Sequence, residues 1–585
     1  MKTRTEIEAK YKWNLDDVCL LSDVEKMLEQ YARRAPELAK FKGKLGDKKE
    51  LKAYLALDKQ LDELIAPALF VLGNSNSVDM ANVDIQKIMQ KAQTILQSTA
   101  KYSTYVLPEL NRLPKGYLRS LTTDPDFADY DMFFKDIIKN SKHIVSKRIA
   151  DFLTKMSQFL GSEGEMRDLL CDSELEFEPA VDSKGEKHEL NEAYYGKYLR
   201  SHDENLRHTA QANLMNGYGK FNKTLACAYT AHVHNDIFHA RLAKHKTVLT
   251  ARLNGDDLNR KVYDTLIRQV HANLDVLHST ISARQNLLGV DKIHFWDLSA
   301  PWCDVNQNYT IDEMKDLVLK AVSPLGKEYE NLVKMKYADQ SIDYLPNKDK
   351  TTGAYCSYNH GSKAVIMMNF DGTFDSVDTL AHEMGHAINN ELIERAQPST
   401  KADNGIFLAE IASTVNELLL YNYMISTAKN KAEKDVYIMK ILNMYMSTIF
   451  TQTLYSEFEH FAHTELENNN ALTYEDYNKK YFNLAKEYYK DSVEVPDYMG
   501  YYWARIPHFY RSYYVFKYAT GMTCALAIVS NIFKDKTFAD RYLDFLRVGG
   551  SKLPLDALND IGIDLTTDQP YKQAFDYARE LIKQI

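Results

Sequence analysis

The stretch TLAHEMGHAINN, residues 379–390, places His382 and His386 four positions apart, with Glu383 directly after the first histidine. On a helix, side chains four positions apart leave the same face about one turn from each other, so both imidazoles can bind one metal ion. Glu383 lies about 100° further around the helix, where its carboxylate can reach a water on that metal but cannot easily share the metal itself. The pattern is typical of a metal site that activates water.

The residues around this motif have the helical period. From residue 375 onward, apolar side chains recur at spacings of three and four. They are Val377, Leu380, Ala381, Met384, Ala387, Ile388 and Leu392. Asp371-Gly372 is a turn signal, and Thr373 and Asp375 offer N-cap oxygens directly after it. Gly385 costs a helix about 1 kcal/mol relative to alanine, so we expect it to permit a close approach of another segment beside the metal.

The chain excludes two common sources of a third metal ligand. One class of related sites has a histidine six residues after the second histidine, where this chain has Leu392. Another class has a glutamate eighteen or nineteen residues after it, where this chain has Gly405 and Ile406. Glu391 and Glu394 remain as local alternatives, although both would have to fold back from the end of the motif helix.

Glu410 is the predicted third ligand. It lies in a second stretch with the helical period, residues 406–424. Two histidines and one carboxylate leave the fourth tetrahedral position for water, which is typical of a catalytic Zn²⁺ site, here one per chain. Glu417, two turns after Glu410, and Asp378, one turn before His382, are candidates to support a ligand histidine. A helix N-terminal charge is the alternative role of Asp378.

Several segments along the chain together resemble a known family. The metal motif at residues 379–386 is followed by FLAEIAST at residues 407–414. GAYC at 353–356, YKWNL at 11–15, and IPHFY at 506–510 with YATG at 518–521 complete the set. These segments look like the oligoendopeptidase F branch of the thimet oligopeptidase family of zinc metallopeptidases. Angiotensin-converting enzyme shares the His-Glu-Met-Gly-His core and a similar glutamate spacing, but it resembles the flanking segments less.

The resemblance implies a mainly α, two-lobed helical zincin-type metallopeptidase with a deep central channel. Composition supports the helical part, because the chain has 23 glycines and 14 prolines in 585 residues, about 4% and 2% against usual shares of about 7% and 5%. No Pro/Gly/Ser-rich linker divides the chain. We expect an N-terminal helical lobe over residues 1–200 and a catalytic zinc-peptidase lobe over residues 201–585. Asp203-Glu204 opens a long helical stretch at the start of the second.

A short strand is predicted immediately before the metal helix, as part of a small β-sheet beside it. Residues 364–369, AVIMMN, form an apolar run between Gly361 and Gly372. If the strand borders the channel, an extended peptide could add to its edge through backbone hydrogen bonds, which would make binding independent of sequence. A buried strand without substrate contact is the alternative.

An aromatic segment, residues 498–518, forms the second region of interest. Most of its rings are expected in the core. Pro507 and Gly521 predict the beginning and end of a helix. On that helix Tyr510, Tyr514 and Tyr518 would line one face at four-residue spacing.

The family resemblance assigns roles within this segment. The relatives use a histidine and tyrosines from it to bind substrate and to stabilise the oxyanion. The histidine corresponds to His508. Some relatives have a tyrosine where this chain has Phe516, so either Tyr514 or Tyr510 is the donor, with Tyr514 the first choice.

The combined prediction is a zinc-dependent endopeptidase that hydrolyses short, unstructured oligopeptides with Glu383 as general base. The restriction to short substrates follows from the channel that the resemblance implies. One alternative is a dipeptidyl carboxypeptidase of the converting-enzyme type, which needs a cation such as Arg505 for the substrate's carboxylate. Another is a catalytically inactive peptide-binding protein, although all three ligands and Glu383 are present.

Composition bounds location and partners. The six cysteines are scattered without paired spacing, which indicates neither a disulfide framework nor a cysteine metal site and fits a reducing cytoplasm. The first residues lack the apolar core of a signal peptide, and no stretch reaches 18 uninterrupted apolar residues. The net charge of −9 argues against nucleic acid as a partner. We therefore expect a cytoplasmic protein without a membrane partner, and the sequence predicts no oligomeric state.

Overall fold

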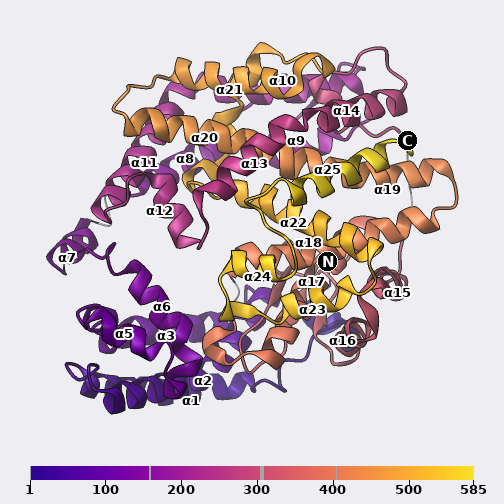
Figure 1. Cartoon of the computed structure of the whole chain (residues 1–585). Coiled ribbons are helices and arrows are strands. Elements are labelled where there is room, and N and C mark those ends of the chain that lie inside the picture. Colours follow the sequence, from indigo (N-terminus) through magenta and orange to yellow (C-terminus); the bar gives the residue numbers. More distant parts are fainter. Residues whose placement is uncertain (1, 146, 157–159, 304–307, 404) are drawn as a thin grey trace. The chain divides into compact units, whose positions relative to one another are not determined.

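The chain folds into two compact units, each built from three stretches of sequence. The computed structural model describes residues 2–145, 147–156, 160–303, 308–403 and 405–585 (Figure 1). Unit 1 comprises Met1–Ser141, Gln307–Tyr423 and Asn531–Gly562, and unit 2 comprises Lys142–Asn306, Met424–Ser530 and Ile563–Ile585. The predicted division into lobes at residue 200 is a single cut in the sequence, and it stays a prediction.

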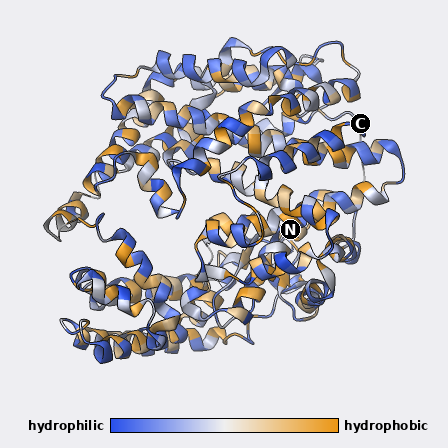
Figure 2. Ribbon diagram, viewed as in Figure 1, coloured by the Kyte–Doolittle hydropathy of each residue, from blue (hydrophilic) through white to orange (hydrophobic). Residues whose placement is uncertain are grey.

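The fold is mostly helical, at 71% of the chain, which confirms the predicted class. The α-helices of unit 1 are α1 (Val24–Arg34), α2 (Lys48–Val78), α3 (Val83–Thr99), α4 (Val106–Leu110), α5 (Lys115–Leu121), α6 (Asp131–Asn140), α15 (Ile311–Ala321), α16 (Gly326–Ala338), α17 (Phe374–Ala396), α23 (Phe538–Leu546) and α24 (Pro554–Asp560), with most of α18 (Gly405–Thr427). Figure 2 shows hydrophilic and hydrophobic residues side by side on helices such as α1, as expected where one face is buried.

Unit 2 has the same helical character. Its α-helices are α7 (Lys147–Met156), α8 (Ser162–Leu169), α9 (Glu192–Leu199), α10 (Glu204–Lys220), α11 (Asn222–Leu242), α12 (Val248–Gly255), α13 (Arg260–Ala272), α14 (Leu274–Leu288), α19 (Lys431–Met444), α20 (Thr451–Glu467), α21 (Tyr474–Tyr489) and α25 (Gln569–Ile582), with most of α22 (Phe516–Lys534). α10 begins where the sequence predicts, with the Asp203 side chain accepting from the Leu206 N–H as N-cap. A membrane-crossing helix, both long and apolar enough, is absent from the part of the chain that the structure describes.

A three-stranded sheet stands beside α17 in unit 1. Its order is β3 (Ile342–Asp343), β5 (Val365–Met367), β4 (Tyr355–Ser357), with β3 parallel and β4 antiparallel to β5. β5 confirms the strand predicted at residues 364–369, and all three of its residues are buried. Because β5 is paired on both sides, it has no free edge, so the buried-strand alternative holds for it. The edge strand that packs against α17 is β4.

Side chains from distant parts of unit 1 fix this sheet. Val365 and Met367 pack in one core with Trp13 and Phe70 from the N-terminal part of the chain. On β3, the buried carboxylate of Asp343 accepts from Lys350 Nζ at 2.7 Å. The same ammonium donates to the Met368 carbonyl at 2.6 Å, so it joins the ends of β3 and β5. The short pairing of β3 with β5 is therefore stabilised both by apolar packing and by the contacts of the Lys350 ammonium.

The prediction of one helix from Pro507 to Gly521 is wrong. Pro507–Tyr510 forms a short 3-10 helix, and α22 begins only at Phe516 and continues through Gly521 to Lys534. Between them, Tyr513 has a left-handed backbone with φ of 56°. Its N–H donates to the buried Glu459 carboxylate at 2.6 Å. This tertiary hydrogen bond outweighs the weak local preference for a continuous helix.

Besides these elements, unit 2 contains one two-stranded hairpin among its described residues. β1 (Ala180–Val181) pairs antiparallel with β2 (Lys187–His188). The hairpin lies close to the start of α10, since the Ser183 N–H donates to the Asp203 carboxylate at 3.0 Å.

Candidate metal centre

The three predicted metal ligands come together where α17 meets α18. Nε2 of His382 and Nε2 of His386 are 3.2 Å apart. Glu410 Oε2 on α18 lies 3.8 Å from each of these nitrogens. Ligand atoms on a tetrahedral zinc, with bonds of about 2.0–2.1 Å, are about 3.3 Å apart. The triangle therefore has the size that one metal ion requires.

The hydrogen bonds of the two histidines leave acceptors facing the centre of the triangle. Nδ1 of His382 bonds the Glu417 carboxylate on α18. His386 makes its other hydrogen bond with the backbone of Ala409. When both rings are neutral and each carries its proton on the far nitrogen, both Nε2 atoms present lone pairs beside the Glu410 carboxylate. Three converging acceptors fit a cation.

Burial and neighbouring charges act on these histidines in opposite directions. Burial lowers the pKa of His386 to about 3, with a further contribution from the adjacent His382. Burial also opposes the charged form of His382, but the bond to Glu417 and the nearby Glu383 and Glu410 outweigh it and raise its pKa to about 9. The carboxylates around His382 therefore favour a positive charge next to them.

Of the two candidates to support a ligand histidine, Glu417 is the one in contact. The carboxylate of Asp378 accepts instead from the Tyr421 hydroxyl at 2.6 Å. Tyr421 lies one turn after Glu417 on α18, so both contacts tie this helix to α17. The Asp378–Tyr421 bond thus contributes to the packing of α17 on α18.

Glu383 is held by the small sheet. Its side chain is 8% exposed, and it accepts a hydrogen bond from the backbone of Cys356 on β4. Burial raises the pKa of Glu383 to about 7, against the lowering effect of His382. A carboxyl group with a pKa near neutrality can both accept and return a proton.

Gly385 provides the close approach that the sequence predicts. A Cβ atom at this position would lie 2.6 Å from the Ala412 carbonyl oxygen and 2.7 Å from the Ser413 Cα. The hydroxyl of Ser413 donates to Glu410 Oε2 at 3.3 Å. The contact between the helices at Gly385 is therefore linked to the position of the third ligand.

The two local alternatives for the third ligand have partners elsewhere. Glu391 pairs with the buried Lys336 at 3.0 Å and with Arg395 at 2.9 Å. Glu394 accepts hydrogen bonds from the Tyr358 hydroxyl and the Gly361 N–H. Neither carboxylate belongs to the triangle.

The predicted substrate-binding residues belong to unit 2, whereas the metal triangle belongs to unit 1. His508 stacks on Tyr514 with ring centroids 6.4 Å apart, and Tyr518 lies edge-on to His508 at 6.0 Å. Tyr510 contacts different rings, with His232 at 5.0 Å. His508 and Tyr514 therefore share one aromatic cluster, and Tyr510 lies in another.

Arg505, the cation required by the carboxypeptidase alternative, is already paired within unit 2. Its Nε donates to both carboxylate oxygens of Glu192, at 2.9 and 3.0 Å. Its guanidinium also lies 4.7 Å from the Tyr195 ring centroid. A substrate carboxylate would have to displace Glu192, which disfavours this role.

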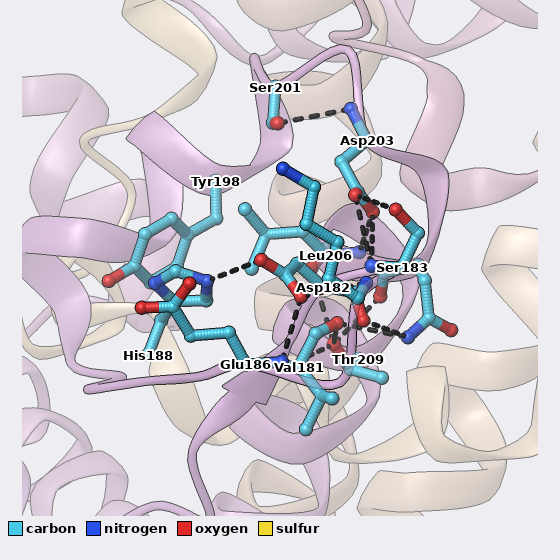
Figure 3. A network of polar contacts seen from close by, with 12 residues as sticks. Val181, Asp182, Ser183, Glu186, His188, Tyr198, Ser201, Asp203, Leu206 and Thr209 are labelled. Carbon is cyan, nitrogen blue, oxygen red and sulfur yellow. Dashed lines mark hydrogen bonds and ion pairs between the residues drawn. The ribbon is translucent and has the colours of Figure 1, made fainter.

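In two other groups of histidines and carboxylates, some members already have protein partners. The groups are Asp182, Glu186 and His188, and Glu204, His294 and Asp297. In the first, drawn in Figure 3, Asp182 accepts from the Glu186 N–H at 2.9 Å and pairs with His188 Nε2 at 3.1 Å, which closes the turn of the β1–β2 hairpin. In the second, Asp297 forms a buried ion pair with Arg207 at 2.6 Å.

Comparisons with known proteins match almost the whole chain. Residues 197–577 match the model of peptidase family M3, and residues 109–177 match that of oligopeptidase F. Oligopeptidase PepF of Bacillus subtilis is 31% identical over 98% of this chain and 86% of its own length. Group B oligopeptidase PepB of Streptococcus agalactiae is 30% identical, covering 98% of this chain and 96% of its own.

Solved structures show the same fold. A Chlamydophila abortus protein described as a peptidase superposes with a TM-score of 0.93 at 28% identity, covering 100% of this chain and 99% of its own. Oligoendopeptidase-F of Enterococcus faecium has a TM-score of 0.70 at 25% identity, covering 96% of this chain and 99% of its own. The sequence resemblance to oligoendopeptidase F is confirmed.

We predict that Gly385→Ala destabilises the protein by about 1–3 kcal/mol, because the added methyl group overlaps the backbone of α18. The matched control is Gly521→Ala in α22, where nothing lies within 4 Å of the added Cβ. That variant is expected to be neutral or to gain up to about 1 kcal/mol in helix propensity. Urea unfolding of both variants measures the difference. Equal effects would contradict the close approach at Gly385.

Proposed function

Because the chain belongs to peptidase family M3, we propose that it is a zinc-dependent endopeptidase that hydrolyses short, unstructured oligopeptides. The observation that carries the proposal is the convergence of His382 Nε2, His386 Nε2 and Glu410 Oε2 within one small triangle. These three side chains would hold one zinc ion per chain and leave room for water. When bound, the ion would supply Lewis-acid activation of water and of the scissile carbonyl.

Glu383 is proposed as the general base and acid. Its carboxylate accepts a proton from the attacking water and returns it to the leaving amine. The backbone hydrogen bond from Cys356 supports this role because it limits the directions in which the carboxylate can turn. Glu417 is proposed to orient His382 through Nδ1, and thereby to keep Nε2 directed at the metal.

His508 and Tyr514 are proposed to bind the substrate and stabilise the oxyanion. Their shared ring cluster supports Tyr514 over Tyr510 as the phenolic donor, since Tyr510 packs on His232 instead. A donor of this kind contributes on the order of 3 kcal/mol to transition-state stabilisation. A channel that admits only short peptides, and a cytoplasmic location, complete the proposal.

Metal affinity tests the role of Glu417. We expect Glu417→Gln to bind zinc about 10–100-fold more weakly, because the neutral amide is a poorer acceptor for the His382 N–H. Competition against a chromogenic chelator gives the dissociation constants. Glu394→Gln is the control, since that carboxylate bonds Tyr358 and Gly361 instead. Unchanged affinity in Glu417→Gln would exclude it as the group that orients His382.

Peptide cleavage tests the function itself. The zinc-loaded protein should cut a peptide of about ten residues, acetylated and amidated at its ends, into internal fragments that a chelator abolishes. Glu383→Gln should keep its zinc and retain less than a tenth of the turnover. Mass spectrometry identifies the products. An uncut blocked peptide, beside a free-ended twin that loses C-terminal dipeptides, would establish the carboxypeptidase instead. Tight binding without turnover would establish a peptide-binding protein.

Steady-state kinetics separate the two tyrosines. We expect Tyr514→Phe to lower kcat about 100-fold with little change in KM, because the phenolic O–H acts on the transition state. Tyr510→Phe is the matched control and should retain most of the activity. The reverse pattern would move the donor role to Tyr510.

A further inference from the structure

Unit 2 contains a cavity of about 750 Å³ that is separate from the residues assigned to hydrolysis. All of its lining residues belong to unit 2. They come from α9, α10, α14, α19, α20 and α21, from residues 446–447, and from the segments around residues 295–303 and 499–505 (Figure 1). None of the metal ligands, and neither His508 nor Tyr514, is among them. The volume falls within the range of about 300–1,000 Å³ that is usual for small-molecule sites.

The charged side chains that line this cavity are all basic. They are Arg200, Arg284, Lys440 and Arg505, and no aspartate or glutamate is found among the described lining residues. The charge of Arg505 is already compensated by its ion pair with Glu192, so the attraction of an anion depends on the other three. The sign of the charge in this cavity is opposite to that of the whole chain, which has 81 acidic and 72 basic residues and is net negative. A concave surface lined by one sign of charge attracts ligands of the other sign. The cavity is therefore suited to an anion.

Arg284 on α14 is the most informative of these residues. It is 2% exposed, and within the described residues it has no carboxylate partner. Its Nη1 donates to the Ala300 carbonyl at 2.9 Å and its Nη2 to Asn443 Oδ1 at 2.7 Å. Its Nε is buried without a hydrogen-bond partner among the described residues. Burial lowers the pKa of this guanidinium to about 10, because the charged form loses its hydration.

The remaining wall is rich in aromatic rings. Trp302 lies below the Arg284 guanidinium, 5.3 Å from its Cζ. Tyr481 and Tyr502 stack on each other, with centroids 5.7 Å apart and planes at 14°. A π-helix, η11 (Tyr445–Phe450), contributes Met446 and Ser447 to the lining. π-helical turns are rare and occur frequently at functional sites.

We propose that this cavity is a binding site for a small organic carboxylate with an aromatic or aliphatic body. The carboxylate pairs with the Arg284 guanidinium in the cavity wall, and the body packs against the rings. One deep guanidinium matches the single charge of a carboxylate. An inorganic anion would leave the aromatic wall without a partner, so the body of the ligand contributes to recognition.

Calorimetric titration with N-acetyl-L-phenylalanine tests the site, because this compound has the carboxylate and the ring but no peptide bond to an adjoining residue. We expect a Kd of about 0.1–1 mM in chelator-treated protein. The amide of the same compound and inorganic phosphate should bind at least tenfold more weakly. Phosphate binding as tight as that of the carboxylate, or no heat from N-acetyl-L-phenylalanine up to 10 mM, would overturn the proposal. Chelator treatment keeps the result independent of the metal centre.

Two variants locate the bound ligand. Arg284→Met removes the charge, and Gly196→Leu on α9 places a side chain in the cavity, where only Arg200 Nη2 lies within 4 Å of the new Cβ. Both should weaken binding at least tenfold. Gly196→Leu removes a helical glycine, so it is expected to fold even if Arg284→Met does not. Gly255→Leu on α12 is the matched control, with nothing within 4 Å of its Cβ. Unchanged binding in a folded Gly196→Leu protein would place the ligand elsewhere.

A separate variant tests whether a carboxylate of the chain itself is the counter-ion of Arg284. Asp304 follows Cys303, which lines the cavity, but it lies outside the described residues. If the site serves an external ligand, Asp304→Asn should bind N-acetyl-L-phenylalanine with the affinity of the unchanged protein. A tenfold gain in affinity would identify Asp304 as the occupant of the site and overturn the proposal.

Discussion

The separation between α17 and α18 is set at Gly385, where the backbone of Ala412 and Ser413 occupies the space of a side chain. At this separation Glu410 and Glu417, two turns apart on α18, reach the two nitrogens of His382 from different sides. The same helix supplies the Ala409 backbone contact to His386. A shift of α18 by the radius of a methyl group would disturb all of these contacts together. The candidate metal centre thus depends on one helix–helix interface rather than on one motif.

The small sheet has a role that its size does not suggest. β5 is buried and paired on both sides, and it fixes β4 against α17. β4 then gives Glu383 a backbone hydrogen bond that the interior of a neighbouring helix could not supply, since the N–H groups there are already used. A few residues in extended conformation thus contact the Glu383 carboxylate in an otherwise helical protein.

Sequence patterns predicted the parts of the site that depend on a single period. The four-residue spacing of His382 and His386, and the helical stretch carrying Glu410, are properties of α17 and α18 alone. The choice of Glu417 over Asp378 could not be made in this way, because both lie at suitable positions along their helices and only the packing angle separates them. The backbone contacts of Cys356 and Ala409 leave no mark in the sequence, since any residue has an N–H or a carbonyl. The prediction of one continuous helix in the aromatic segment is wrong for a related reason. The buried Glu459 carboxylate lies outside this segment, and by accepting the Tyr513 N–H it interrupts the helix there.

The order of segments along the chain has a consequence for synthesis on the ribosome. Unit 1 needs residues 531–562 and unit 2 needs residues 563–585 to be complete. Within unit 1, Asn389 of α17 donates to the Leu546 carbonyl at 2.8 Å, and α23 packs on the same helix. Asn389 therefore emerges 157 residues before Leu546, and the nascent chain must keep the apolar surface of α17 exposed in the meantime. We therefore expect this protein to complete its folding after synthesis, and we expect chaperones to bind the growing chain in the cell.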